Sequence, residues 1–155
     1  MEQYHKTHTF LSDALTLEAG KEIEKAVAEK KPFYLNMAHY AVHSPFETDE
    51  RFISHYTDPN KSQQARAFAT LIEGMDKSLG DILDKLEDMG IAENTLIIFL
   101  GDNGGDAPLG DAADYGSSAP FKGKKGSEYE GESVFLSLSA GHIPTQTINS
   151  KRHIL

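Results

Sequence analysis

The sequence contains no cysteine among its 155 residues, and this absence excludes several kinds of chemistry. Disulfide bonds, thiolate metal sites and a cysteine nucleophile are all ruled out. Long apolar runs are also lacking, because no stretch approaches the ~20 residues that a membrane-spanning helix needs. The first six residues contain no apolar core of the kind found in a signal peptide. We therefore expect no membrane span, and no export signal in the sequence as it stands.

Positive charge is scarce as well. The 15 lysine and arginine residues face 24 aspartate and glutamate residues, which gives a formal net charge of -9. That charge repels a phosphate backbone, and the few lysine clusters form no basic stripe with interleaved aromatic residues. We therefore expect no nucleic-acid partner. What is present, 39% hydrophobic and 25% charged residues, is ordinary for one soluble domain with a real core.

The first half of the chain predicts an alternation of helix and strand. Thr16 is a candidate N-cap for a helix that continues to about Lys30. The apolar and aromatic run over 33–38 is typical of a short strand, and it ends at the polar segment 39–45. A short helical stretch is expected over 49–55.

The second half contains the clearest element, a long helix predicted over 62–89 by apolar residues at three- and four-residue spacing. Gly90 suits the C-terminal cap of this helix. The continuous apolar run over 95–100 predicts a strand covered on both faces, and 134–138 is a candidate final strand. Together these elements predict an α/β fold, with a sheet flanked by helices.

The segment 101–131 is rich in glycine, aspartate, serine and lysine, and its length makes it a candidate functional loop; a mobile insertion is the alternative. Asp102, Asn103 and Gly104 directly follow the buried strand, where α/β folds bind ligands. Carboxylate and amide oxygens are suitable ligands for calcium or magnesium. Read alone, these residues fit an ordinary turn equally well.

Two further features are candidates for binding an anion. His43 lies in a loop at the mouth of a strand, where it can donate to an anion or act as a general acid. His39 is four residues earlier, but the intervening chain is not helical, so we do not expect a zinc pair. The run 122–126 (KGKKG) brings ammonium groups and glycines together. The alternatives are an exposed hydrogen-bonded histidine and a solvated charge run.

The order and spacing of these pieces resemble the sulfatase family, over a region from about Asp13 to Gly131. The matching segments are 31–35 (KPFYL), 41–45 (AVHSP), the long helix, 94–99 (NTLIIF), 102–104 (DNG) and 123–131 (GKKGSEYEG). The ordered set is far more specific than any one motif.

The resemblance implies a partial sulfatase-like sheet that lacks the family's N-terminal strands. It implies that Asp102 and Asn103 bind calcium, and that Lys125 contacts a sulfate oxygen and the bridging oxygen of the leaving group. His43 would bind sulfate and protonate the departing alcohol. The implied substrate is a sulfated small molecule or carbohydrate, and the implied parent is exported to the periplasm, the extracellular space or the lysosome.

The sequence departs from the family pattern at two places. It has no Cys/Ser-X-Pro-X-Arg motif, the source of the formylglycine nucleophile, and no upstream strand with the paired aspartates of the calcium site. After Gly131 it continues Glu132-Ser133-Val134-Phe135, where the family has a glycine and an Arg-Val-Pro segment. We therefore expect a truncated chain, and a changed reading frame near Glu132 is a further hypothesis.

These departures define the expected organisation and its alternatives. A polar segment over 1–12 precedes a partial catalytic domain over 13–139, and the irregular tail over 140–155 need not be native. We expect marginal folding and little or no turnover from the isolated chain. The competing hypotheses are a phosphatase or phosphodiesterase of the alkaline-phosphatase-like superfamily, and a non-catalytic anion- or metal-binding remnant. The sequence leaves the oligomeric state open.

Overall fold

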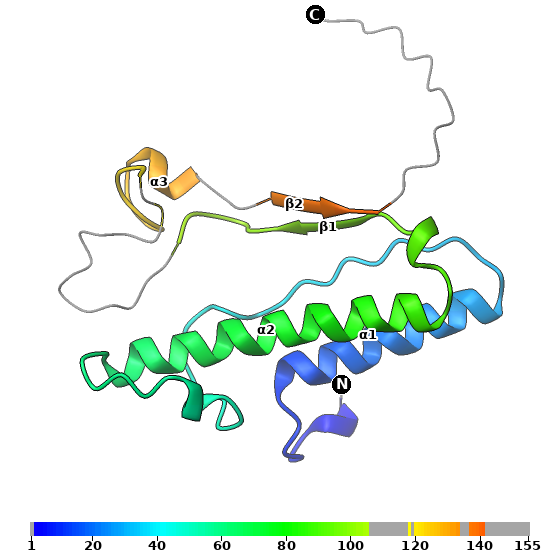
Figure 1. Ribbon diagram of the computed structural model, residues 1–155, viewed down its shortest axis with the longest axis horizontal. Coiled ribbons are helices and arrows are strands. Elements are labelled where there is room, and N and C mark those ends of the chain that lie inside the picture. Colours follow the sequence, from blue (N-terminus) through cyan, green and yellow to red (C-terminus); the bar gives the residue numbers. More distant parts are fainter. Residues whose placement is uncertain (1, 106–117, 119, 134–136, 142–155) are drawn as a thin grey trace, which may run out of the picture.

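The computed structural model describes residues 2–105, 118, 120–133 and 137–141 (Figure 1). Its elements in chain order are η1 (Glu2–Tyr4), α1 (Leu11–Ala28), η2 (Ile53–His55), α2 (Gln63–Asp88), η3 (Ala92–Asn94), β1 (Ile97–Leu100), α3 (Glu130–Ser133) and β2 (Ser137–Ala140). No helix in this part of the chain is both long enough and apolar enough to cross a membrane. The architecture is a partial α/β domain, as the sequence predicted.

The helices α1 and α2 pack against each other along most of their length, and the two strands lie on one side of them (Figure 1). The buried residues of the two helices are mostly small. The most deeply buried residues on the two helices are Ser12, Ala14, Thr16, Ala19, Ile23, Ala65, Ala67, Thr70, Leu71, Gly74, Ser78 and Leu86.

The helix α2 is capped at both ends, and its C-terminal end follows the predicted Gly90. The Ser62 hydroxyl accepts a hydrogen bond from the Ala65 amide at 3.1 Å, which satisfies a free N–H of the first turn. After the helix, Gly90 has φ +67°, a conformation that favours glycine, and the Ile91 amide donates to the Leu86 carbonyl at 3.0 Å. The predicted helix over 62–89 is therefore confirmed.

The predicted start of the first helix is wrong. Helix α1 begins at Leu11, after an extended Phe10 that makes no side-chain cap. Thr16 lies buried inside the helix, where its hydroxyl donates to the Ser12 carbonyl at 2.7 Å. A threonine hydroxyl can bond the carbonyl four residues earlier, so it does not need to mark a helix start.

The strand β1 pairs with β2 in antiparallel register, with Ile97 opposite Ala140 and Leu100 opposite Ser137. The prediction that β1 is covered on both faces is wrong, because burial alternates along it and Ile98 and Leu100 are 57% and 59% exposed. The expected final strand is present but starts at Ser137, and residues 134–136 of that prediction lie outside the described part.

The predicted strand over 33–38 does not form. This segment runs from α1 past α2 without pairing to another strand in the described part of the chain (Figure 1). Tyr34 is 92% exposed. A strand needs a partner for its backbone groups, and the two described strands pair only with each other. Further on, Phe46 contacts Phe68 of α2 edge to face, with ring centroids 5.3 Å apart.

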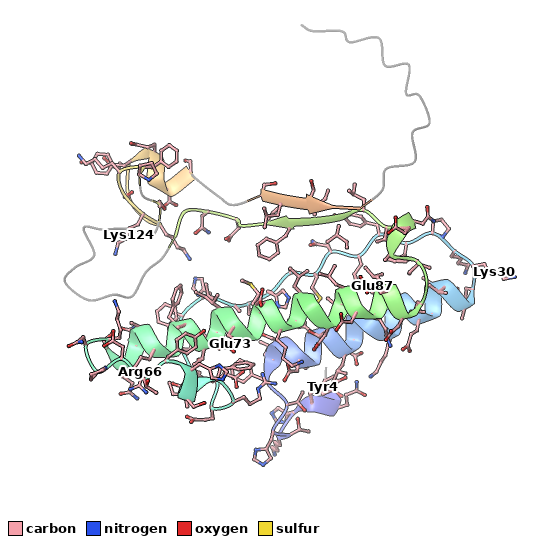
Figure 2. The ribbon with its side chains drawn as sticks, viewed as in Figure 1. Tyr4, Lys30, Arg66, Glu73, Glu87 and Lys124 are labelled. Atoms are coloured by element: carbon pink, nitrogen blue, oxygen red, sulfur yellow. The ribbon has the colours of Figure 1, made fainter. Side chains whose placement is uncertain are left out.

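The segment 49–55 joins α1 to α2 through an ion-pair network. A helical stretch was predicted over this whole segment, and its last three residues form the 3-10 helix η2. The Arg51 guanidinium donates to both carboxylate oxygens of Asp49, at 2.9 and 2.6 Å, and to Asp13 of α1 at 2.5 Å. The Asp49 amide donates to the Thr70 hydroxyl of α2 at 3.0 Å. His55 in η2 pairs with Glu73 of α2 at 2.8 Å (Figure 2).

Candidate functional site

The predicted metal ligands Asp102 and Asn103 lie in a bend that follows β1. Asp102 is exposed and Asn103 is half-buried, while Gly104 directly after them is buried. The bend is the point at which the chain leaves the sheet (Figure 1). The two polar side chains therefore extend from the end of a strand, as the sequence predicted.

A second segment, residues 120–132, packs against this bend through backbone hydrogen bonds. We call it the lysine loop. The Lys125 amide donates to the Gly105 carbonyl at 3.1 Å, and the Gly104 amide donates to the Glu132 carbonyl at 2.7 Å. A Cβ atom at Gly104 would lie 1.8 Å from the Gly131 carbonyl oxygen, so only glycine fits there. The structure thus places the Lys125 backbone against Gly105, in the chain segment that also holds Asp102 and Asn103.

The lysine loop is organised by its own side chains. The Lys122 ammonium lies over the Tyr129 ring, 4.0 Å from its centroid, and the Lys122 amide donates to the Glu130 carboxylate at 3.2 Å. Backbone hydrogen bonds from its own amide and from Lys122 lower the pKa of the Glu130 carboxyl. Lys124 projects from the same loop (Figure 2). Tyr129 and Glu130 therefore both hold Lys122 in place.

His43 lies in an exposed turn of the segment between α1 and η2. Its amide donates to the Tyr40 carbonyl at 3.0 Å, and its Nδ1 lies 2.9 Å from the Ser44 carbonyl. Because a carbonyl only accepts, Nδ1 carries the proton and Nε2 is the acceptor of the neutral ring. Within the described part of the chain, no hydrogen bond or ion pair joins His43 to the bend or to the lysine loop.

His39 differs from His43 in that it is half-buried and faces α2. Its Nε2 lies 3.3 Å from the Ser78 hydroxyl, which in turn bonds the Thr16 hydroxyl of α1. Its Nδ1 is buried and has no hydrogen-bond partner among the residues that the structure describes. Burial lowers the pKa of this imidazole. His39 thus belongs to the helix contact, and sequence spacing alone gave no signal for that role.

The donor set of the bend suits a hard cation but does not complete a site. A carboxylate and an amide oxygen are the ligand types that calcium prefers, and calcium takes six to eight of them. Among the residues that the structure describes, no group of three or more histidine or acidic side chains is placed to hold a metal ion. Asp102 and Asn103 can therefore supply two ligands of such a site.

The described surface also has two hollows, of about 440 and 300 Å³. The larger lies between the end of α2 and the strands, and is lined by Leu86 and Ile97 among others. The smaller lies beside α1, against the segment 31–35. Neither of these two hollows includes His43, Asp102, Asn103 or Lys125.

The fold and this cluster define a piece of an α/β domain in which oxygen ligands at a strand end lie beside a lysine loop. The family model described as Sulfatase matches residues 1–153. The chain is 31% identical to the N-acetylgalactosamine-6-sulfatase of Homo sapiens over 139 residues, which cover 88% of this chain and 24% of the human protein. It is 33% identical to arylsulfatase J of Mus musculus over 101 residues, or 65% and 16% of the two chains.

A solved structure, that of Ps i-CgsB in complex with k-i-k-neocarrahexaose, matches with a TM-score of 0.76 at 29% identity. The match covers 90% of this chain and 29% of that one. The chain belongs to the sulfatase family. It spans between 16% and 29% of the length of these three proteins.

Proposed function

We propose that this chain is part of the catalytic domain of a sulfuric ester hydrolase, and that its loop cluster binds the sulfate group. The observation that carries the proposal is the hydrogen bond from the Lys125 amide to the Gly105 carbonyl, 3.1 Å long. It holds a cationic residue beside the oxygen ligands Asp102 and Asn103. An ammonium group and a divalent cation together neutralise the oxygens that gather charge when a sulfate ester is cleaved.

In this proposal each predicted residue takes part in binding or in proton transfer. Asp102 and Asn103 hold calcium, which polarises a sulfate oxygen when bound, and Lys125 binds a sulfate oxygen and the bridging oxygen of the ester. His43 binds sulfate and gives a proton to the departing alcohol. Its Nδ1–H is engaged with the Ser44 carbonyl, so Nε2 is the atom that carries this proton.

The substrate that we propose is a sulfated carbohydrate. The support is indirect: one relative is named for N-acetylgalactosamine 6-sulfate chemistry, and the matching structure holds a neocarrahexaose. The parent is then an exported protein, and residues 13–139 are its contribution to the catalytic domain. Because this chain has no Cys/Ser-X-Pro-X-Arg motif, the isolated polypeptide has no formylglycine and little or no turnover.

The proposal is tested by sequencing the coding DNA on both sides of this reading frame and in all frames near the codon for Glu132. An upstream Cys/Ser-X-Pro-X-Arg motif and an Arg-Val-Pro continuation are the expected findings. The restored protein should then hydrolyse sulfate esters in preference to phosphate esters, and Lys125→Ala should remove most of that activity. Preference for phosphate esters would support the phosphatase alternative, and neither flanking feature would support a non-catalytic relative.

A further inference from the structure

Ser118 lies buried where the bend after β1 meets the lysine loop. Only 7% of it is exposed to solvent. Its hydroxyl oxygen accepts a hydrogen bond from the Gly105 amide at 3.1 Å and donates one to the Gly131 carbonyl at 2.9 Å. A hydroxyl group has one donor, which here is used, so this side chain joins the two loops from both sides.

These two bonds are part of a closed ring of hydrogen bonds and short stretches of backbone. The Gly131 amide donates to the Lys122 carbonyl at 2.8 Å, and the chain then continues through Gly123 and Lys124 to Lys125. The Lys125 amide donates to the Gly105 carbonyl at 3.1 Å, which returns the ring to its start. Every other member of the ring contributes backbone atoms. Ser118 is the one member of the described ring that contributes a side chain to it.

The packing around the ring leaves little freedom for other contacts to replace the hydroxyl. A Cβ atom at Gly131 would lie 2.5 Å from the Gly123 carbonyl oxygen and 2.6 Å from that of Lys122. The backbones are thus in direct contact on both sides of Gly131. If the hydroxyl is removed, the Gly105 amide and the Gly131 carbonyl lose a partner in a buried place, which costs more than the loss of an exposed hydrogen bond.

We propose that Ser118 is a positioning residue, whose hydroxyl fixes the separation between the ligands Asp102 and Asn103 on one loop and Lys125 on the other. The inference rests on the proposed function only in the identity of what these residues bind. Replacing residues that orient metal ligands without touching the metal typically lowers the metal affinity about 10–100-fold.

The same serine begins a segment, Ser118-Ala119-Pro120-Phe121-Lys122, that differs from Ser-X-Pro-X-Arg only in its last residue. Its geometry does not suit a nucleophile, because the hydroxyl is buried and both of its hydrogen bonds go to backbone groups. A reacting serine needs an oxygen that the substrate can approach. The structure therefore assigns Ser118 to positioning and not to reaction.

The test compares Ser118→Ala and Ser118→Thr in the full chain with Ser127→Ala as a matched control. Ser127 lies in the same loop, and its hydroxyl accepts from the Lys124 amide at 3.1 Å, so it bonds within one loop and not between two. The first readout is amide hydrogen exchange. Ser118→Ala should speed exchange at Gly105 and Lys125 about fivefold or more, because both buried hydrogen bonds of the hydroxyl are lost, while α2 stays protected. Ser118→Thr, which keeps the hydroxyl, should restore most of the protection.

The second readout is a calcium titration followed by the amide NMR signals of the bend. Ser118→Ala should weaken calcium binding about tenfold or more, as seen for residues that support metal ligands. Ser127→Ala should stay within about twofold of the parent chain, and Ser118→Thr should recover the affinity. Unchanged exchange and unchanged affinity in Ser118→Ala would overturn the inference.

The two readouts separate the inference from the proposed function. If the parent chain binds no calcium, the calcium site fails, and exchange alone then decides whether Ser118 couples the loops. Equal acceleration of the loop and of α2 would mean a general loss of folding and would count against a positioning role. Loss of protection in Ser118→Ala that Ser118→Thr does not rescue would do the same.

Discussion

Several polar side chains are buried in the described part of this chain, and Asp49 is the clearest case. It is 2% exposed, and the Arg51 guanidinium bonds both of its oxygens. Arg51 itself lies between two aromatic rings, 5.7 Å from the centroid of Phe10 and 5.1 Å from that of Phe52. Sequence patterns gave no signal for this network, because Asp13 is distant in the chain from Asp49 and Arg51 and each of the three resembles an ordinary surface charge.

We predict that Asp49→Asn lowers the free energy of unfolding at pH 7 by roughly 2 kcal/mol, since a hydrogen bond to a charged group contributes about 1.5–3 kcal/mol. Burial alone raises the pKa of Asp49, but the hydrogen bonds and charge of Arg51 lower it below the ordinary 3.8. The stabilisation is thus present above pH 3.8 and is lost as the pH falls through the lower pKa of the folded state. Urea unfolding at pH 7 and at pH 3 measures both effects. The exposed Asp84→Asn is the control, and an equal loss there would contradict the account.

His39 gives the chain a second pH dependence. Burial lowers the pKa of its imidazole below the ordinary 6.5, so the folded state favours the neutral ring. Its contribution to stability is therefore fully present above pH 6.5 and decreases as the pH falls towards the folded-state pKa. We predict that the chain is less stable at pH 5 than at pH 7.5, and that His39→Gln reduces this difference. The check is the urea midpoint at the two pH values, with the exposed His43→Gln as control.

At the scale of elements, local sequence signals predicted the helices better than the strands. Ser62 and Gly90 mark the ends of α2 because caps act on neighbouring residues. Strand formation depends on a partner from elsewhere in the chain, and the apolar run over 33–38 finds none in the described part. The face of α2 was also only partly predictable. Ile72 is 43% exposed although its spacing indicated burial, while Gly74 faces Asp49 and Phe52 and Ser78 bonds Thr16 of α1.

The candidate site was likewise only partly predictable from the sequence. The sequence pointed to Asp102, Asn103 and Lys125 through motif order, and the structure brings their two loops together. It did not reveal Ser118, because a serine that bonds two backbone groups has no pattern of its own. His43 lies in a loop as predicted, and its role stays a prediction.

Contact between the two loops depends on a glycine that has no room for a side chain. We predict that Gly104→Ala separates the bend from the lysine loop, because its Cβ would lie 1.8 Å from the Gly131 carbonyl oxygen. Amide exchange at Lys125 should then rise to the level of an open loop. The matched control is Gly80→Ala in α2, where a Cβ meets nothing within 4 Å. That variant should instead stabilise the chain by about 0.5–1 kcal/mol. Normal protection at Lys125 in Gly104→Ala would refute the packing described here.

At the scale of the whole molecule, the described core is small. Four of its seven buried apolar residues are alanines, and these bury little apolar surface. At the same time Ile98 and Leu100 of β1, and Leu96 just before it, are exposed on one face of the sheet. A sheet with one uncovered apolar face and free edges gains little stability and favours association.

We predict that the isolated chain melts at a low temperature with weak cooperativity, and that it associates as its concentration rises. Scanning calorimetry and light scattering across a concentration series check this. Replacing Ile98 and Leu100 with threonine should reduce association, because it removes apolar area from the exposed face. A sharp, high-temperature transition of a monomer would contradict this account of the core.

The central claim is that the bend and the lysine loop form part of a sulfatase site, and a calcium titration of the full chain tests it most directly. Calorimetry of the parent chain and of Asp102→Ala, with Asp84→Ala as the control, gives the comparison. The account predicts weak binding at millimolar calcium, because two ligands are far fewer than the six to eight that calcium takes. The binding should disappear in Asp102→Ala and persist in Asp84→Ala. The same heat in all three proteins, or none in the parent chain, would contradict a cation site at the bend.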